Sequence, residues 1–135
     1  MSPANVNPMD ELIAAARAAR AHAYAPYSRY AVGAAVRGAN GRIYTGANVE
    51  NASYGLSICA ERSAIFRAIT EGERRIEALC LYTPSPIPST PCGACRQVIH
   101  EFGADALIIC CIDDEAAERR YALSELLPDA FRLPK

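Results

Sequence analysis

Residues 76–112 read IEALCLYTPSPIPSTPCGACRQVIHEFGADALIICCI, and this stretch decides the fold. The segments 76–83 and 106–112 are almost continuously apolar, which is typical of strands buried on both faces. Between them, after a proline-rich loop, the pattern predicts a helix over about 91–103. Gly103 is expected to end that helix as a C′ glycine. Two buried strands joined through a helix need cover on each face of their sheet.

The flanking segments supply the remaining elements of the predicted fold. They indicate an amphipathic helix over about 8–24, a second helix over about 59–71, a weak strand near 119–123 and a helical turn near 124–128. Between the first two helices, Asn40-Gly41 predicts a β-hairpin. Because helices alternate with buried strands, we expect an α/β fold built as a three-layer α/β/α sandwich.

Length and composition bound the classes of protein that fit. The 135 residues suit one domain, 1–135, and a chain that is 51% hydrophobic and 21% charged is globular. No apolar run is long enough to cross a membrane, and the opening MSPANVNPMDELI lacks the pattern of a signal peptide. The net charge of −1 argues against binding to nucleic acid or an anionic membrane. We expect a cytoplasmic protein.

The six cysteines divide into two groups. A disulfide framework needs an oxidising compartment, which the sequence does not indicate. Three cysteines lie inside the apolar segments and are expected to be core residues: Cys80, Cys110 and Cys111. The other three each stand where a predicted helix begins: Cys59, Cys92 and Cys95. This second group calls for a chemical explanation.

The spacing of these three cysteines predicts a zinc site with one open position. Cys92 and Cys95 are separated by three positions in a first helical turn, so their side chains share a face. Cys59 would supply a third thiolate from another helix. His22 and His100 are both expected to be ordinary surface or hydrogen-bonded residues, which leaves no evident fourth ligand. Three protein ligands are typical of catalytic zinc, whereas structural zinc takes four.

Two charged residues follow Cys59 in the sequence. Glu61, taken alone, is an acid that favours the positive end of a helix. Beside a zinc site with an open position it is better interpreted as a proton shuttle, provided that Cys59 caps the helix and Glu61 lies in the first turn. Arg62 is either a solvated surface residue or a hydrogen-bond donor to the thiolates.

These residues resemble a known family. Cys59-Ala60-Glu61 and Pro91-Cys92-Gly93-Ala94-Cys95 match the two halves of the zinc-dependent deaminase signature. The stretches YSRYAVGAA (27–35), GANVENASYG (46–55) and ELLPDAF (125–131) are similar to the small cytidine deaminases that act on free nucleosides. The resemblance implies a mixed five-stranded sheet, one Zn²⁺ per chain and a homotetramer. It also implies hydrolysis of cytidine and 2′-deoxycytidine to the uridines and ammonia, a step of pyrimidine salvage.

The resemblance also implies how a nucleoside would bind. Asn48 and Glu50 match the residues that hold the ribose 3′-hydroxyl, and the Ala60 N–H would meet the pyrimidine carbonyl. Tyr54 and Phe131 match residues that reach into the pocket of a neighbouring chain. Tyr30 stands where the family usually has Phe against the base, so it adds a hydroxyl to an apolar wall.

Other interpretations of the motifs stay open from the sequence. A deaminase of a modified cytosine nucleoside, such as blasticidin S or an N4-substituted cytidine, would carry the same zinc motifs, although Glu50 favours an ordinary ribose. A nucleic-acid editing domain would need a basic channel, against which the net charge argues. Two non-enzymatic alternatives also stay open: a structural zinc module and a Cys-x-x-Cys motif with a redox role.

Overall fold

The central stretch folds as its apolar pattern predicts. The structure is a computed structural model that describes residues 7–135, so residues 1–6 of the expected domain lie outside the described residues. The stretch forms β3 (Ile76–Tyr82), α3 (Gly93–Phe102) and β4 (Leu107–Cys111). The two strands pair in parallel, with Leu79 opposite Ile108. Parallel neighbours with apolar residues along their whole length lie at the centre of a covered sheet.

The other strands extend this pair into a mixed sheet. They are β1 (Gly33–Gly38), β2 (Ile43–Ala47) and β5 (Arg119–Ala122). The sheet has five strands in the order β2-β1-β3-β4-β5, and every neighbouring pair except β3–β4 is antiparallel. The hairpin between β1 and β2 turns at Gly41, whose φ of 84° suits the glycine of the Asn-Gly dipeptide. The predicted mixed five-stranded sheet is confirmed.

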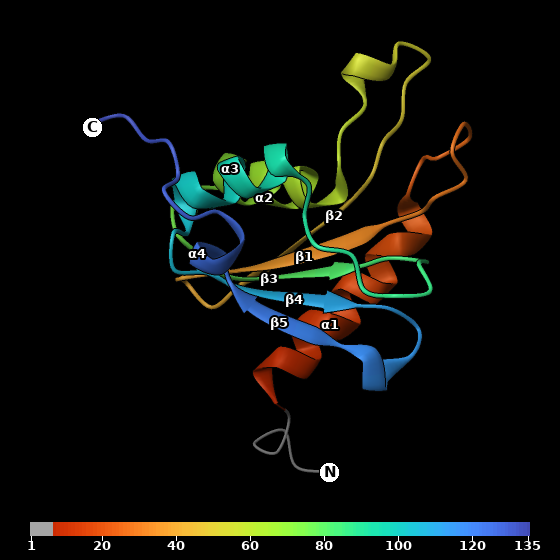
Figure 1. Ribbon diagram of the computed structural model, residues 1–135, viewed down its shortest axis with the longest axis horizontal. Helices are drawn as coiled ribbons and strands as arrows, with labels where there is room; N and C mark the ends of the chain where they lie inside the picture. The colour runs from red at the N-terminus through yellow and green to blue at the C-terminus, as the bar shows by residue number, and fades with distance from the viewer. Residues whose placement is uncertain (1–6) are drawn as a thin grey trace.

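Helices cover both faces of the sheet, as Figure 1 shows. On one face α1 (Pro8–Ala19) packs against Ala78, Cys80 and Ile109. On the other face lie α2 (Ala60–Thr70), α3 and α4 (Leu123–Leu126), which share a core with Leu79 and Ile108. Neighbouring strand residues thus point to opposite layers, which is the three-layer sandwich that the sequence predicts. Among residues 7–135, none of the helices combines the length and hydropathy that a membrane crossing requires.

The cysteines of the apolar segments are core residues. Cys80 and Cys110 are fully buried, and Cys111 is 5% exposed. Cys80 and Cys111 lie in the layer of α1, whereas Cys110 faces α2 and α3. All three are free thiols, so the prediction that they act as small apolar side chains is confirmed.

Two helix ends differ from the sequence prediction. The first helix was expected to reach residue 24, but α1 ends at Ala19 and a short 3₁₀ turn follows, because Tyr24 instead pairs with the backbone of Asn48 and Glu50. Gly103 does end α3, but its φ is −159°, so it is extended and not the left-handed C′ glycine that was expected. A Cβ on Gly103 would lie 2.3 Å from the Ile76 carbonyl oxygen, so close packing requires the glycine.

Candidate active site

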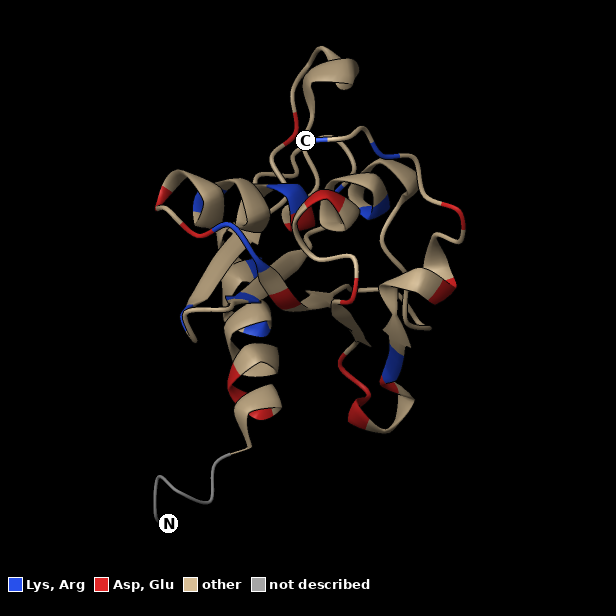
Figure 2. Cartoon of the chain, turned by 90° about the vertical axis from the view of Figure 1, so that its left-hand side faces the viewer, with Lys and Arg blue, Asp and Glu red and all other residues tan. Residues whose placement is uncertain are grey.

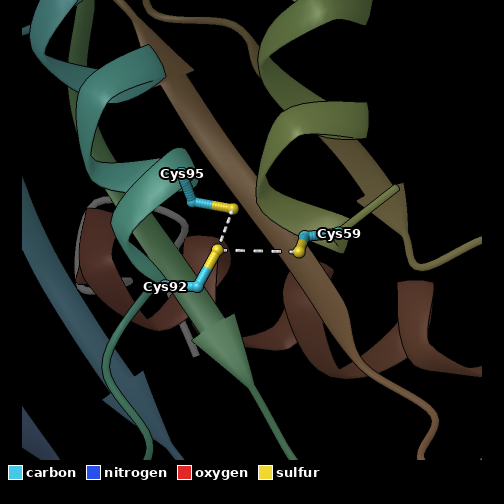
Figure 3. Close-up of side chains that lie close together, drawn as sticks. All are labelled: Cys59, Cys92 and Cys95. Carbon is cyan, nitrogen blue, oxygen red and sulfur yellow. Dashed lines mark hydrogen bonds between the residues drawn. The ribbon is translucent and has the colours of Figure 1, made fainter. Parts of the chain in front are cut away.

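Three sulfur atoms meet where two helices begin, as Figure 3 shows. Cys59 is the residue before α2 and Cys92 the residue before α3, while Cys95 lies in the first turn of α3. The Cys59 and Cys92 Sγ atoms are 3.9 Å apart, and the Cys92 and Cys95 Sγ atoms 3.5 Å. All three sulfurs lie within 4.8 Å of one another.

The cluster fits one zinc ion per chain. Tetrahedral zinc with Zn–S bonds of about 2.3 Å places two sulfurs about 3.8 Å apart, close to the separations found here. Thiolates are soft ligands that suit zinc, and within residues 7–135 this group of potential ligands contains no fourth side chain. His22 is exposed and His100 is half-buried on α3, and neither belongs to the cluster.

The surroundings of Cys59 favour its negatively charged form. Arg62 donates a hydrogen bond from Nη2 to Cys59 Sγ at 3.3 Å, which is the second of the two roles that the sequence left open for it. The Cys95 thiol and then the Arg62 guanidinium lower the pKa of Cys59 to about 5. Both helix N-termini point their positive ends at the sulfurs, which partly offsets the charge of three thiolates.

Glu61 lies beside the sulfurs in the first turn of α2. Its side chain is almost fully buried, and this burial raises the pKa of the carboxyl to about 7. A carboxyl with that pKa can both accept and release a proton near neutral pH. The sequence analysis required, for Glu61 to act as a proton shuttle, that Cys59 cap the helix and Glu61 lie in its first turn. The structure has this arrangement, because Cys59 directly precedes α2 and Glu61 is its second residue.

A single cavity of about 300 Å³ joins the cluster to most of the other expected site residues. Its lining includes two residues of the cluster, Cys59 and Cys92, and five other expected site residues: Tyr30, Asn48, Glu50, Ala60 and Glu61. Four hydroxyl residues that the sequence did not indicate also line it: Ser57, Thr83, Ser89 and Thr90. The last three follow β3, where the Ser and Thr residues of the proline-rich segment were the one available signal.

Asn48 and Glu50 are held in place by the backbone around them. Asn48 Oδ1 accepts from the Val32 N–H at 2.8 Å, and its Nδ2 donates to the Tyr30 carbonyl at 2.7 Å. Glu50 Oε1 accepts the N–H groups of Tyr27 and Ser28 at 3.0 and 3.1 Å, and Oε2 accepts from the Ser28 hydroxyl. Hydrogen bonds from Ser28 lower the pKa of Glu50, so the cavity presents a fixed carboxylate at this end.

Four of the expected site residues are not part of the cavity lining: Cys95 and Arg62, which lie at the sulfur cluster, and the aromatic residues Tyr54 and Phe131. Tyr54, on the connection between β2 and α2, is 77% exposed, and Phe131, near the C-terminus, is 67% exposed. Figure 1 shows the β2–α2 connection standing out from the body of the molecule. Within one chain neither ring lines the cavity, although Tyr54 borders an adjoining pocket together with Glu50 and Ser57, which do line it.

The family of the chain follows from comparison with known proteins. A family model described as the cytidine and deoxycytidylate deaminase zinc-binding region matches residues 7–111, which contain the whole sulfur cluster. The chain belongs to the cytidine and deoxycytidylate deaminase family. Cytidine deaminases from Sporosarcina psychrophila and Mycobacterium tuberculosis are similar in sequence to this chain. The first is 41% identical over 91% of this chain and 90% of its own length. The second is 47% identical over 85% of this chain and 83% of its own length.

Solved structures of this deaminase family share the fold. The cytidine deaminase of Burkholderia pseudomallei superposes with a TM-score of 0.86 at 45% identity, covering 90% of this chain and 98% of its own. The cytidine deaminase of Mycobacterium tuberculosis gives a TM-score of 0.80 at 43% identity, covering 96% of this chain and 100% of its own. The relatives carry the name cytidine deaminase, so the comparisons do not favour the alternative of a modified-nucleoside deaminase.

Proposed function

We propose that this chain is a zinc hydrolase that converts cytidine and 2′-deoxycytidine to the uridines with release of ammonia. One observation carries the proposal: three sulfurs from two helix N-termini converge beside a buried carboxyl, at the wall of a cavity that also holds Asn48 and Glu50. We place the reaction in pyrimidine salvage in the cytoplasm, and the active form as a homotetramer of single-domain chains.

Cys59, Cys92 and Cys95 would hold the zinc ion. When bound, zinc acidifies a water in its open position and makes it a nucleophile at neutral pH. Glu61 takes a proton from the attacking water and delivers it to N3 of the pyrimidine, which makes C4 more electrophilic. Once the water oxygen has added to C4, Glu61 takes the second proton of that oxygen and passes it to the amino group; the bond between C4 and the amino nitrogen then breaks, C4 becomes a carbonyl, and ammonia leaves. Arg62 keeps the Cys59 sulfur oriented through its hydrogen bond.

The remaining cavity residues would hold and orient the nucleoside. Ala60 begins α2, so its N–H has no carbonyl partner within the helix and is free to meet the pyrimidine carbonyl. Glu50 would accept the ribose 3′-hydroxyl, with Asn48 beside it and Tyr30 against the base. A nucleic-acid substrate is disfavoured by the net charge of −1, and Figure 2 shows basic residues interspersed with acidic ones.

The direct test is turnover of cytidine by purified protein of known zinc content. We expect the absorbance of cytidine to fall as uridine forms, with one ammonia released per nucleoside. A substrate panel should include 2′-deoxycytidine, blasticidin S, an N4-substituted cytidine and a cytosine-containing oligonucleotide. Failure on both cytidine and 2′-deoxycytidine, with or without turnover of another member, would overturn the proposal.

The role of Glu50 predicts dependence on the 3′-hydroxyl. We expect kcat/KM for 3′-deoxycytidine to be roughly tenfold to a hundredfold below that for cytidine, because a hydrogen bond to a carboxylate is lost. Steady-state kinetics with both substrates measure this, and Glu50→Gln should reduce the turnover of cytidine more than that of 3′-deoxycytidine. Equal turnover of both nucleosides by the unaltered protein would contradict the role.

The exposed aromatic residues predict that the pocket is completed by a neighbouring chain. We expect Phe131→Ala to raise KM for cytidine roughly tenfold, since an aromatic contact in the neighbour's pocket is lost. The fold should be unaffected, because the ring is 67% exposed in the single chain. Leu133→Ala is the matched control, since Leu133 is 69% exposed and close in sequence. A fully active monomer, measured by light scattering during gel filtration, would refute this role.

A further inference from the structure

Glu50 lies between the cavity and the pocket that adjoins it. Glu50 and Ser57 line both, and the adjoining pocket is completed by Tyr27, Ser28 and Tyr54. Ser28 is not part of the cavity lining itself. It can therefore act on a molecule in the cavity only through the residues that it contacts.

The hydrogen bonds of Glu50 leave a free acceptor position on one particular oxygen. An ionised carboxylate offers about four such positions, two on each oxygen. Among the described residues, Oε1 accepts the N–H groups of Tyr27 and Ser28 at 3.0 and 3.1 Å, and Oε2 accepts from the Ser28 hydroxyl. Both positions on Oε1 are thus filled. The free position is on Oε2, the oxygen that the Ser28 hydroxyl holds.

The other contact of Ser28 fixes the direction in which its hydroxyl donates. Ser28 Oγ accepts the N–H of Tyr30 at 3.0 Å. Arg29, between the two, has a φ of 58°, and this left-handed residue belongs to the turn that brings the Tyr30 N–H back to the serine. A hydroxyl has a single hydrogen and a carboxylate only accepts, so that hydrogen goes to Glu50. These bonds from Ser28 also lower the pKa of Glu50, which keeps its carboxyl ionised.

We infer that Ser28 is a positioning residue that holds Glu50 Oε2 in place for the ribose 3′-hydroxyl. The inference rests on the proposed function. Without the Ser28 hydroxyl, Oε1 would keep its two N–H donors, but Oε2 would have two free positions and would pair with water instead. A 3′-hydroxyl would then have to displace that water and order the oxygen. Ser28 would thus set how strongly the site selects nucleosides that carry a 3′-hydroxyl.

The test compares cytidine with 3′-deoxycytidine, which differ by the oxygen that Glu50 would meet. We expect Ser28→Ala to reduce the ratio of the two kcat/KM values by roughly threefold to tenfold, the effect of one hydrogen bond. The fall should come from cytidine, with 3′-deoxycytidine nearly unchanged. The affinities of the products, uridine and 3′-deoxyuridine, should shift in the same direction in calorimetry. Because each measurement is a ratio, a general loss of folded or zinc-loaded protein cancels.

Three further variants show whether the hydroxyl acts through Glu50. Ser28→Thr keeps the hydroxyl and should keep the ratio of the unaltered protein. Ser124→Ala, at an exposed position of α4 outside the cavity lining, should leave it unchanged. In a protein that already carries Glu50→Gln, adding Ser28→Ala should reduce the ratio no further, because the two residues act as one unit.

Two outcomes would overturn the role of Ser28 while leaving cytidine deamination intact. One is an unchanged ratio in Ser28→Ala, and the other is a further loss when Ser28→Ala is added to Glu50→Gln. If the unaltered protein does not deaminate cytidine, the proposed function fails. The role of Ser28 then stands only if Ser28→Ala shifts the ratio of the uridine and 3′-deoxyuridine affinities as expected.

Discussion

Glu61→Gln is expected to bind zinc and fold as the unaltered protein does, yet to lose roughly 10³- to 10⁴-fold in kcat for cytidine. The amide has nearly the shape of the carboxyl but cannot take a proton from water and return it to the base. No other carboxyl lines the catalytic end of the cavity, since Glu50 lies at the end assigned to the ribose within the described lining. KM should change far less than kcat, because proton transfer by Glu61 stabilises the transition state and contributes little to binding of the substrate.

A matched control for this variant lies at the other end of the same helix, just after its last residue. Glu71 follows α2 directly and is paired with Arg67 at 3.1 Å, outside the cavity lining. Glu71→Gln should therefore stay within about twofold of the unaltered protein, as exposed ion pairs contribute little. Zinc content, measured by elemental analysis, must remain at one per chain in both variants. Near-normal kcat for Glu61→Gln would refute the shuttle role.

Cys92→Ala is expected to lose bound zinc and all activity above background. Two sulfurs cannot hold the ion against a chelator as three do, and the nucleophile is no longer supplied. The melting temperature should also fall, because binding to the folded state stabilises it. Zinc content after dialysis, cytidine turnover and thermal unfolding together measure the effect.

A cysteine outside the cluster provides the control for this loss. Cys110 is fully buried in the core shared with α2 and α3. Cys110→Ala should cost about 1 kcal/mol in the free energy of unfolding, as expected for a small cavity, and keep one zinc per chain. A Cys92→Ala protein that retains stoichiometric zinc would exclude Cys92 as a ligand.

Local patterns predicted the buried strands and the Cys92–Cys95 half of the zinc cluster because both depend on short-range geometry. The continuous apolar runs indicated buried parallel strands, and the three-residue spacing of Cys92 and Cys95 placed two sulfurs on one face of a first turn. The meeting of Cys59 with that pair is a long-range contact, which the sequence suggested only through chemical need and resemblance.

Contacts between distant segments explain what the sequence missed. The early end of α1 depends on the pairing of Tyr24 with residues near Asn48, and the extended Gly103 depends on the approach of Ile76. The sequence did not indicate the hydrogen bond between the Tyr30 and Ser85 hydroxyls for the same reason, since the two residues lie far apart in the chain. The turn-forming residues of the loop 84–90 predict a loop, but they do not predict which side of the active-site cavity that loop will line.

The central claim is that three sulfurs, from Cys59, Cys92 and Cys95, hold one catalytic zinc ion and leave one position open. X-ray absorption at the zinc edge of purified, cytidine-active protein tests it most directly. The account predicts three sulfur neighbours at about 2.3 Å and a single lighter neighbour. A shell of four sulfurs, a shell containing histidine nitrogen, or full activity without zinc would contradict it.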